Sequence, residues 1–258
     1  MIKIVDIWKR FNSLEVLKGL NLNIEQGEIL VILGRSGVGK SVLLKHIIGI
    51  EKPDKGYVEV DGINITALNE HDLYAVVQNM GMLFQGCALF DSLNVESNTA
   101  FYLSQHVDPV SKKKLSENEI KERVREALKM VDLEGTEKKM PSDLSGGMKK
   151  RAALARLIAY RPKILLYDEP TTGLDPMTAT QINELIIRIQ NELKGTSIVV
   201  THDIHSALFI ADRLALQEGG IITELAPAEK FLSIDNPIVS FLKENLEHHP
   251  LKRREEHG

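Results

Sequence analysis

The sequence predicts an α/β fold, in which helices cover a mainly parallel sheet and an α-helical subdomain is inserted into the core. Three observations support this prediction. Short apolar runs of the kind found in buried parallel strands stand at residues 28–33, 164–167 and 197–200. Helical patterns separate these runs, and such alternation builds a parallel sheet with helices on its faces. Between about Leu93 and Arg161 the strand-like segments fade and helical spacing takes over.

Size and composition fit an ordinary globular protein. The chain has 258 residues, of which 43% are hydrophobic and 26% are charged, values that exclude a disordered or fibrous chain. We expect a single domain over residues 1–246 and a polar tail over 247–258. Within the domain we expect a core at about 1–90 and 162–225, a helical subdomain at about 91–161, and C-terminal helices at about 226–246.

Net charge and cysteine content limit which classes of partner and which cellular compartment the sequence is compatible with. The formal net charge is −4, which argues against a nucleic acid held by bulk charge. The single cysteine, Cys87, fits a reducing compartment and is more typical of a packed apolar residue than of a nucleophile. Asp6 interrupts any signal peptide, and no stretch has the about 20 apolar residues that a transmembrane helix needs. We therefore expect a cytoplasmic chain that reaches a membrane only through another subunit.

The expected elements follow from local patterns. Residues 20–24 alternate with period two, as a half-buried strand does. Ile120, Val124, Leu128 and Val131 recur at helical spacing with charges between them. The expected strands are 2–7, 20–24, 28–33, 56–62, 164–167 and 197–200, and the expected helices are 42–50, 118–131, 147–160 and 237–246.

A glycine-rich loop follows the first buried strand. Gly34 to Ser41 (GRSGVGKS) matches the pattern G-x-x-x-x-G-K-[ST]. Glycines let consecutive backbone N–H groups wrap a phosphate, and the helix that follows adds its positive end. Lys40 supplies a cation for the β- and γ-phosphates, and the Ser41 hydroxyl suits Mg²⁺. The loop therefore predicts a nucleotide site.

Two carboxylates follow the apolar run at residues 164–167. Ligands of open parallel sheets bind where the strands end. There, Asp168 suits Mg²⁺ held through water, and Glu169 suits polarisation of an attacking water. Taken alone, such a pair is more often a solvated acidic turn, so the assignment depends on the other motifs.

A second anion cradle precedes this pair by about twenty residues. Leu144 to Met148 (LSGGM) places a serine and two glycines before a predicted helix. A kinase or GTPase with one nucleotide site has no need of a second cradle. With these motifs in this order, the chain resembles the ABC-type ATPases over nearly its whole length, although Met148 stands where glutamine is commoner in that family.

The resemblance implies a P-loop NTPase (RecA-like) core with a mainly parallel sheet, an N-terminal antiparallel β part and an inserted α-helical subdomain. It also implies ATP and Mg²⁺ as cofactors and assigns the site residue by residue. Catalytic residues would be Glu169, His202 and Lys40. Nucleotide would be bound by Phe11, which stacks on adenine, by Gly34, Arg35, Ser36, Gly37, Val38, Gly39, Lys40, Ser41 and Val42, by the Q-loop residue Gln85, and by Ser145, Gly146, Gly147 and the D-loop residue Asp175. Metal ligands would be Ser41, Gln85 and Asp168.

The same resemblance implies partners. Two such domains sandwich two ATP molecules head to tail, and this chain has one copy of each motif, so a C2 homodimer is the simplest assembly. Residues 85–95 and 144–156 resemble the ATPases of Mla/Mce-type lipid transport, which work with a membrane permease, an MCE-domain lipid carrier and often a STAS-domain subunit. Gly86-Cys87 stands where that subfamily has Ser-Gly, and Leu157 stands where it has alanine. The chain would lie on the inner face of the cell membrane. Leu89, Phe90 and Leu93 would be either core residues or apolar contacts to the permease.

Other functions predict other features. A soluble ABC ATPase acting in assembly or on nucleic acid would have a coiled-coil insert, zinc cysteines or tandem domains, and a regulatory module without turnover would lack Glu169. A polar-solute importer of the amino-acid type remains an alternative. Lys149, Lys150 and Arg151 are either a solvated helix face or an attraction for phosphate. The tail either stays solvated or orders against a second ATPase chain or an accessory subunit.

Overall fold

The computed structural model describes residues 2–247, so the expected polar tail lies, apart from Glu247, outside the described residues. The N-terminal part is an antiparallel sheet in the order β2-β1-β4-β5. Its strands are β1 (Ile2–Phe11), β2 (Leu14–Ile24), β4 (Lys55–Val60) and β5 (Ile63–Asn64). Both β1 and β2 are longer than their sequence patterns predict, because irregular register between them interrupts the simple alternation of apolar and polar residues.

The second sheet has the order β10-β9-β3-β8-β7-β6. Strands β9, β3, β8, β7 and β6 pair in parallel, and β10 pairs antiparallel with β9. The strands are β3 (Ile29–Leu33), β6 (Met80–Leu83), β7 (Ile164–Asp168), β8 (Thr196–Thr201), β9 (Arg213–Glu218) and β10 (Ile221–Pro227). The predicted α/β class, with its mainly parallel sheet, is confirmed.

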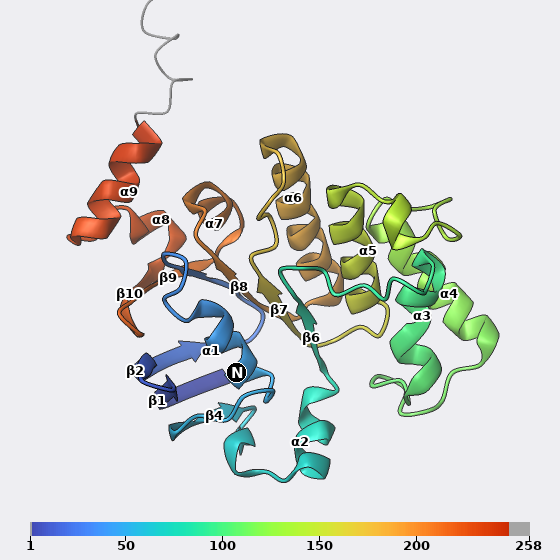
Figure 1. Cartoon of the computed structure of the whole chain (residues 1–258), viewed down its shortest axis with the longest axis horizontal. Coiled ribbons are helices and arrows are strands. Elements are labelled where there is room, and N and C mark those ends of the chain that lie inside the picture. The colour runs from blue at the N-terminus through green and yellow to red at the C-terminus, as the bar shows by residue number, and fades with distance from the viewer. Residues whose placement is uncertain (1, 248–258) are drawn as a thin grey trace, which may run out of the picture.

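Helices surround this sheet, and a group of them projects from one end (Figure 1). Helix α1 (Lys40–Ile47) starts at the glycine-rich loop, two residues earlier than predicted. The projecting group contains α3 (Val95–Gln105), α4 (Glu117–Met130) and α5 (Gly146–Ile158). The others are α2 (Glu70–Val77), α6 (Pro176–Leu193), α7 (Ile204–Ile210), α8 (Ala228–Phe231) and α9 (Pro237–Glu247), with short 3₁₀ turns η1 (Ile65–Ala67) and η2 (Pro141–Asp143).

Several elements have no clear signal in the sequence, and β6 shows why. Its sequence MGML lacks β-branched residues and contains Gly81, which weakens a strand on its own. A Cβ at Gly81 would lie 2.8 Å from the Tyr160 hydroxyl and 3.0 Å from Leu157. The glycine is thus required by the close approach of α5, a contact that sequence periodicity does not reveal. Elements α2, α3, β9 and β10 were likewise not predicted.

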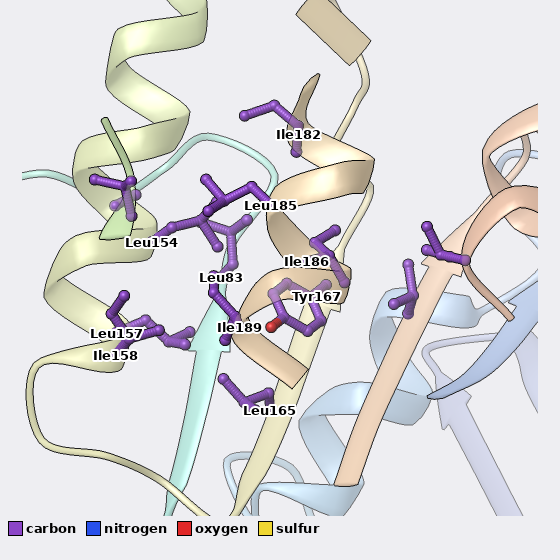
Figure 2. Close-up of a cluster of buried hydrophobic side chains, with 14 of the residues drawn as sticks. Leu83, Leu154, Leu157, Ile158, Leu165, Tyr167, Ile182, Leu185, Ile186 and Ile189 are labelled. Atoms are coloured by element: carbon purple, nitrogen blue, oxygen red, sulfur yellow. The ribbon is translucent and has the colours of Figure 1, made fainter. Parts of the chain in front are cut away.

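The parallel sheet is buried on both faces. Side chains alternate along β3: Leu30 and Ile32 join a cluster with the antiparallel sheet and α1, whereas Val31 and Leu33 join a cluster with the helices. In the second cluster, Leu154 of α5 lies beside Leu83 and Leu185, and Tyr167 lies beside Ile186 (Figure 2). Among residues 2–247, no helix is long and apolar enough to cross a membrane.

Candidate functional site

The glycine-rich loop joins the end of β3 to the start of α1. Gly39 is the N-cap of α1 with φ of 100°, and no side chain caps this helix end. Two glycines are required by close approach: a Cβ at Gly34 would lie 2.6 Å from the Gln217 carbonyl oxygen, and one at Gly39 would lie 2.7 Å from Val16. The first-turn N–H groups are therefore available to an anion, as in other phosphate-binding helix starts.

Lys40 is held inside this loop. Its side chain is only 5% exposed, and Nζ donates to the carbonyl oxygens of Gly34 at 2.7 Å and Arg35 at 3.0 Å. Nζ also lies 3.3 Å from Oε1 of Glu169. The ammonium thus stands between the loop and the carboxylate, where it can balance phosphate charge.

Asp168 ends β7 beside the start of α1. The Ser41 hydroxyl donates to Asp168 Oδ1 at 2.7 Å. Burial raises the pKa of the Asp168 carboxyl, and the hydrogen bond from Ser41 opposes that rise. A hydroxyl and a carboxylate at this spacing are the oxygen ligands that Mg²⁺ takes beside nucleotide phosphates, and Gln85 lines the same cleft. The described residues include no cluster of three or more His, Cys, Asp or Glu suited to a metal.

Glu169 has an unusual backbone conformation. Its φ is 48°, a left-handed value that costs a non-glycine residue about 1–2 kcal/mol. Its Oε2 accepts from Thr172 Oγ1 at 2.9 Å and lies 2.8 Å from His202 Nδ1. Burial would raise the pKa of this carboxyl, but the hydrogen bonds from His202 and Thr172 and the charge of Lys40 outweigh it, and the pKa is lowered. The surroundings of Glu169 therefore favour the ionised form of its carboxyl.

Most of these groups line one cleft where the parallel strands end, and Asp168 contacts that cleft through Ser41. The cleft brings together the glycine-rich loop, Gln85, Glu169 and His202 from four separate parts of the sequence. The lining residues are Val16, Ser36, Gly37, Gly39, Lys40, Ser41, Val42, Gln85, Glu169, Thr172 and His202. The arrangement can bind phosphate, balance its charge and present an ionised carboxylate to water.

Other predicted site residues lie outside this cleft. Ser145 is the N-cap of α5 and accepts from Met148 N at 3.3 Å, and Asp175 is the N-cap of α6 and accepts from Thr178 N at 3.0 Å. Gly146 and Gly147 open α5 beside Ser145. Phe11 ends β1 with 42% exposure, which excludes a role as a core aromatic. Its stacking on adenine stays a prediction.

The sequence gives no signal for two supporting residues, Thr172 and Gln217, and the structure corrects the interpretation of a third, Lys150. Thr172 bonds Glu169 from three residues downstream, and Gln217 Nε2 donates to the Val38 carbonyl at 3.0 Å. The sequence predicts that Lys150 either lies on a solvated helix face or attracts phosphate. In the structure Lys150 is only 4% exposed, and its ammonium donates to backbone carbonyl oxygens. The solvated-face interpretation is thus wrong for Lys150. The sequence Lys149-Lys150-Arg151 does not indicate which of its three cationic side chains is buried.

A second cleft lies beside residues 88–90. Phe90 is 40% exposed, and its ring centroid lies 4.4 Å from that of Phe101, with the two rings tilted by 40°. The Arg156 guanidinium lies 5.5 Å from the Phe90 ring and donates to the Ala88 carbonyl at 2.6 Å. The lining residues are Met82, Phe84, Ala88, Phe90, Phe101, Tyr102, Arg156, Leu157 and Tyr160. Leu89 and Leu93 are half-buried, so Phe90 is the apolar side chain most available from this segment.

Comparison with known proteins places these motifs in a family. Residues 17–172 match the family model described as ABC transporter. The chain is 40% identical over 238 residues to the probable ribonucleotide transport ATP-binding protein mkl of Mycobacterium leprae, covering 92% of this chain and 67% of that protein. It covers 65% of the mkl protein of Mycobacterium tuberculosis. The chain therefore spans about two thirds of the length of these relatives.

Two further relatives have different described cargoes. Identity is 42% to the intermembrane phospholipid transport system ATP-binding protein MlaF of Haemophilus influenzae, covering 88% of this chain and 84% of that protein. It is also 42% to the methionine import ATP-binding protein MetN of Clostridium tetani, covering 85% and 67%. Among solved structures, the dimeric post-hydrolysis state of the ATP-binding cassette MJ0796 with ADP and Pi matches with a TM-score of 0.79 and 33% identity, covering 88% of this chain and 99% of that chain.

Proposed function

Because the chain belongs to the ABC transporter family and carries an ATPase domain of that family, we propose that it drives lipid transport through a separate permease. The observation that supports ATP hydrolysis most directly is the meeting of Lys40, Ser41, Asp168 and Glu169 at one sheet edge. The lipid cargo rests on the likeness to MlaF, the relative named above that the chain covers at 84%.

Each residue at this edge takes one task in the proposal. The loop N–H groups and Lys40 hold the phosphates of ATP, and the ionised Glu169 accepts a proton from the attacking water. His202, which contacts Glu169, positions the γ-phosphate. Ser41, Gln85 and, through water, Asp168 would hold Mg²⁺, which when bound supplies charge neutralisation to the phosphates.

A homodimer completes the proposed site. Four predicted nucleotide-binding residues lie at the starts of helices and do not line the cleft of the same chain: Ser145, Gly146, Gly147 and Asp175. In a head-to-tail C2 pair they would close on the nucleotide held by the partner chain. The dimeric cassette among the structural neighbours supports this arrangement.

The cleft at Phe90 is the proposed permease contact. Its exposed aromatic ring and apolar walls suit a helix end of a membrane partner. Through that partner the chain would work on the inner face of the cell membrane, with an MCE-domain carrier and a STAS-domain subunit as further proposed components. Phe90→Glu should uncouple transport and weaken permease binding, while ATP binding by the chain survives. Ile63→Glu is the matched control, because Ile63 is also an exposed apolar residue but lies on β5 and does not line this cleft.

The test of cargo uses the complex purified from its own membrane through a tag on this chain. We expect phospholipid to co-purify and phospholipid vesicles to change the ATPase rate, with a Glu169→Gln complex reporting contaminating activity. The likeness to MetN favours a second candidate, an importer of polar solutes. A complex without bound lipid, whose ATPase responds to a polar-solute binding protein, would establish that alternative and contradict the lipid proposal.

A further inference from the structure

Lys150 is a buried cation on helix α5, and its contacts join two parts of the nucleotide cleft. Its ammonium donates to the Gln85 carbonyl oxygen at 2.7 Å and lies 3.4 Å from the Glu169 carbonyl oxygen. The side chain is 4% exposed. One ammonium therefore bridges the backbone that carries Gln85 and the backbone that carries the proposed base.

Both bridged segments have strained backbone. Cys87 and Ala88, just after Gln85, have φ values of 64° and 49°, and Glu169 has 48°. Non-glycine residues persist in this region only where their surroundings hold them. The Glu169 N–H donates to the Val200 carbonyl at 2.9 Å. Lys150 holds the carbonyl side of the same residue, so contacts on both sides fix the direction of the Glu169 side chain.

Helix α5 holds the first segment with a second cation. Arg156 donates to the carbonyl oxygens of Cys87 at 3.1 Å and Ala88 at 2.6 Å. Lys150 and Arg156 thus fix three carbonyls within four residues of the Gln85 segment. Of the two, only Lys150 also reaches Glu169, so it alone links the two segments directly.

Burying the charged ammonium of Lys150 costs free energy, and the packing of α5 does not require a charge at this position. Burial lowers the pKa of its ammonium, and Asp168 and Glu169 are among the charges that oppose this. Ala153 and Leu154, three and four residues further along the same helix face, are apolar and buried. An uncharged side chain would therefore suit this face of α5, and the retained charge points to a task at the two carbonyls.

We propose that Lys150 is a positioning residue for ATP hydrolysis, which holds the Gln85 and Glu169 segments in a fixed relation. This inference rests on the proposed role of Glu169. Lys150 is not among the residues that line the nucleotide cleft. Its loss should therefore slow the chemical step without weakening the binding of ATP.

The test compares Lys150→Met, Lys150→Gln and Lys150→Arg in the full chain. We expect Lys150→Met to lower kcat by about 10- to 100-fold, the effect of displacing a catalytic group by about 1 Å. Affinity for a fluorescent unhydrolysed ATP analogue should change by less than about threefold. Lys150→Arg, which keeps the charge and its donors, should recover most of the rate. Lys150→Gln, which keeps a donor without charge, should fall between Met and Arg.

Lys121→Met, at an exposed position of α4, is the matched control and should keep the wild-type rate. Thermal unfolding of each variant separates misfolding from slow chemistry, and if Lys150→Met fails to fold, the Gln and Arg variants carry the comparison. Wild-type kcat in folded Lys150→Met or Lys150→Gln, or equal loss in the Arg and Gln variants, would overturn this inference alone. A wild-type chain that hydrolyses no ATP would overturn the proposed function and the inference together.

Discussion

The sheet edge and helix α5 hold their functional groups by different means. At the edge, each group stands in a short motif directly after a strand or at a helix start, and parallel pairing of β3, β8 and β7 brings the motifs together. On α5, Lys150 and Arg156 reach carbonyls 65 and 68 residues away in the sequence. The function of the cleft residues therefore depends on the chemistry of their side chains. The function of the α5 residues depends on the packing that holds this helix in place.

Removal of the base at the sheet edge should give the largest effect. Glu169→Gln keeps the shape of the side chain but cannot accept a proton, so kcat should fall by about 10²- to 10⁴-fold. ATP affinity should stay near the wild-type value, and an ATP-bound dimer should accumulate. Phosphate release and sedimentation with and without ATP measure both effects. Near-wild-type turnover would show that this edge does not work by the chemistry assigned to Glu169.

A cavity under α5 should change stability instead of chemistry. Leu154 is fully buried between Leu83 and Leu185 (Figure 2), so Leu154→Ala should lower the free energy of unfolding by about 2–5 kcal/mol. Nucleotide affinity of the folded variant should change little, because the P-loop side of the sheet keeps its contacts. Urea unfolding measures the loss, with exposed Leu14→Ala as control. Equal stability of the two variants would contradict the packing account of α5.

Loss of the aromatic ring at Phe11 tests a site residue that the geometry leaves outside the cleft. Phe11→Ala should weaken ATP binding by about 1–3 kcal/mol, the range of base–aromatic stacking, and Phe11→Tyr should bind normally. Because the ring is 42% exposed, stability should hardly change. Titration calorimetry with an unhydrolysed analogue measures the affinity. Unchanged affinity in the alanine variant would remove Phe11 from the nucleotide site.

The smallest expected effect concerns His46, a buried residue in the last turn of α1. Burial lowers the pKa of His46 below its ordinary value of 6.5, although the hydrogen bond to the Val42 carbonyl opposes this. The unfolded chain therefore binds the proton more tightly, and the free energy of unfolding should fall as pH drops through 6.5 and below.

One proton limits that slope to about 1.4 kcal/mol per pH unit. Urea unfolding at several pH values, compared with His46→Gln, isolates the contribution of His46, and exposed His71→Gln serves as control. A wild-type slope equal to that of His46→Gln would show that α1 does not bury a neutral histidine.

The same difference between the two regions explains what the sequence could predict. The cleft residues on the glycine-rich loop, Asp168 and Glu169 were predicted because phosphate chemistry needs those residue types at fixed local spacing. Lys150 and Gly81 carry no such signal, because their roles depend on contacts between α5 and segments far away in the sequence. Thr172 and Gln217 support the cleft through side chains that a motif does not require.

The order of the strands also determines when each strand of the newly synthesised chain can find its partner strands. Strand β1 pairs with β2 and β4 within the first 60 residues. Strand β3 pairs only with β8 and β9, as Ile29 does with Ser197. At about 5–20 residues per second, about 8–34 seconds of translation separate the end of β3 at Leu33 from the end of β8 at Thr201. During that interval the apolar strand Ile29–Leu33 has no partner strand. Strand β3 can therefore form its native parallel pairing only after β8 (Thr196–Thr201) has been synthesised.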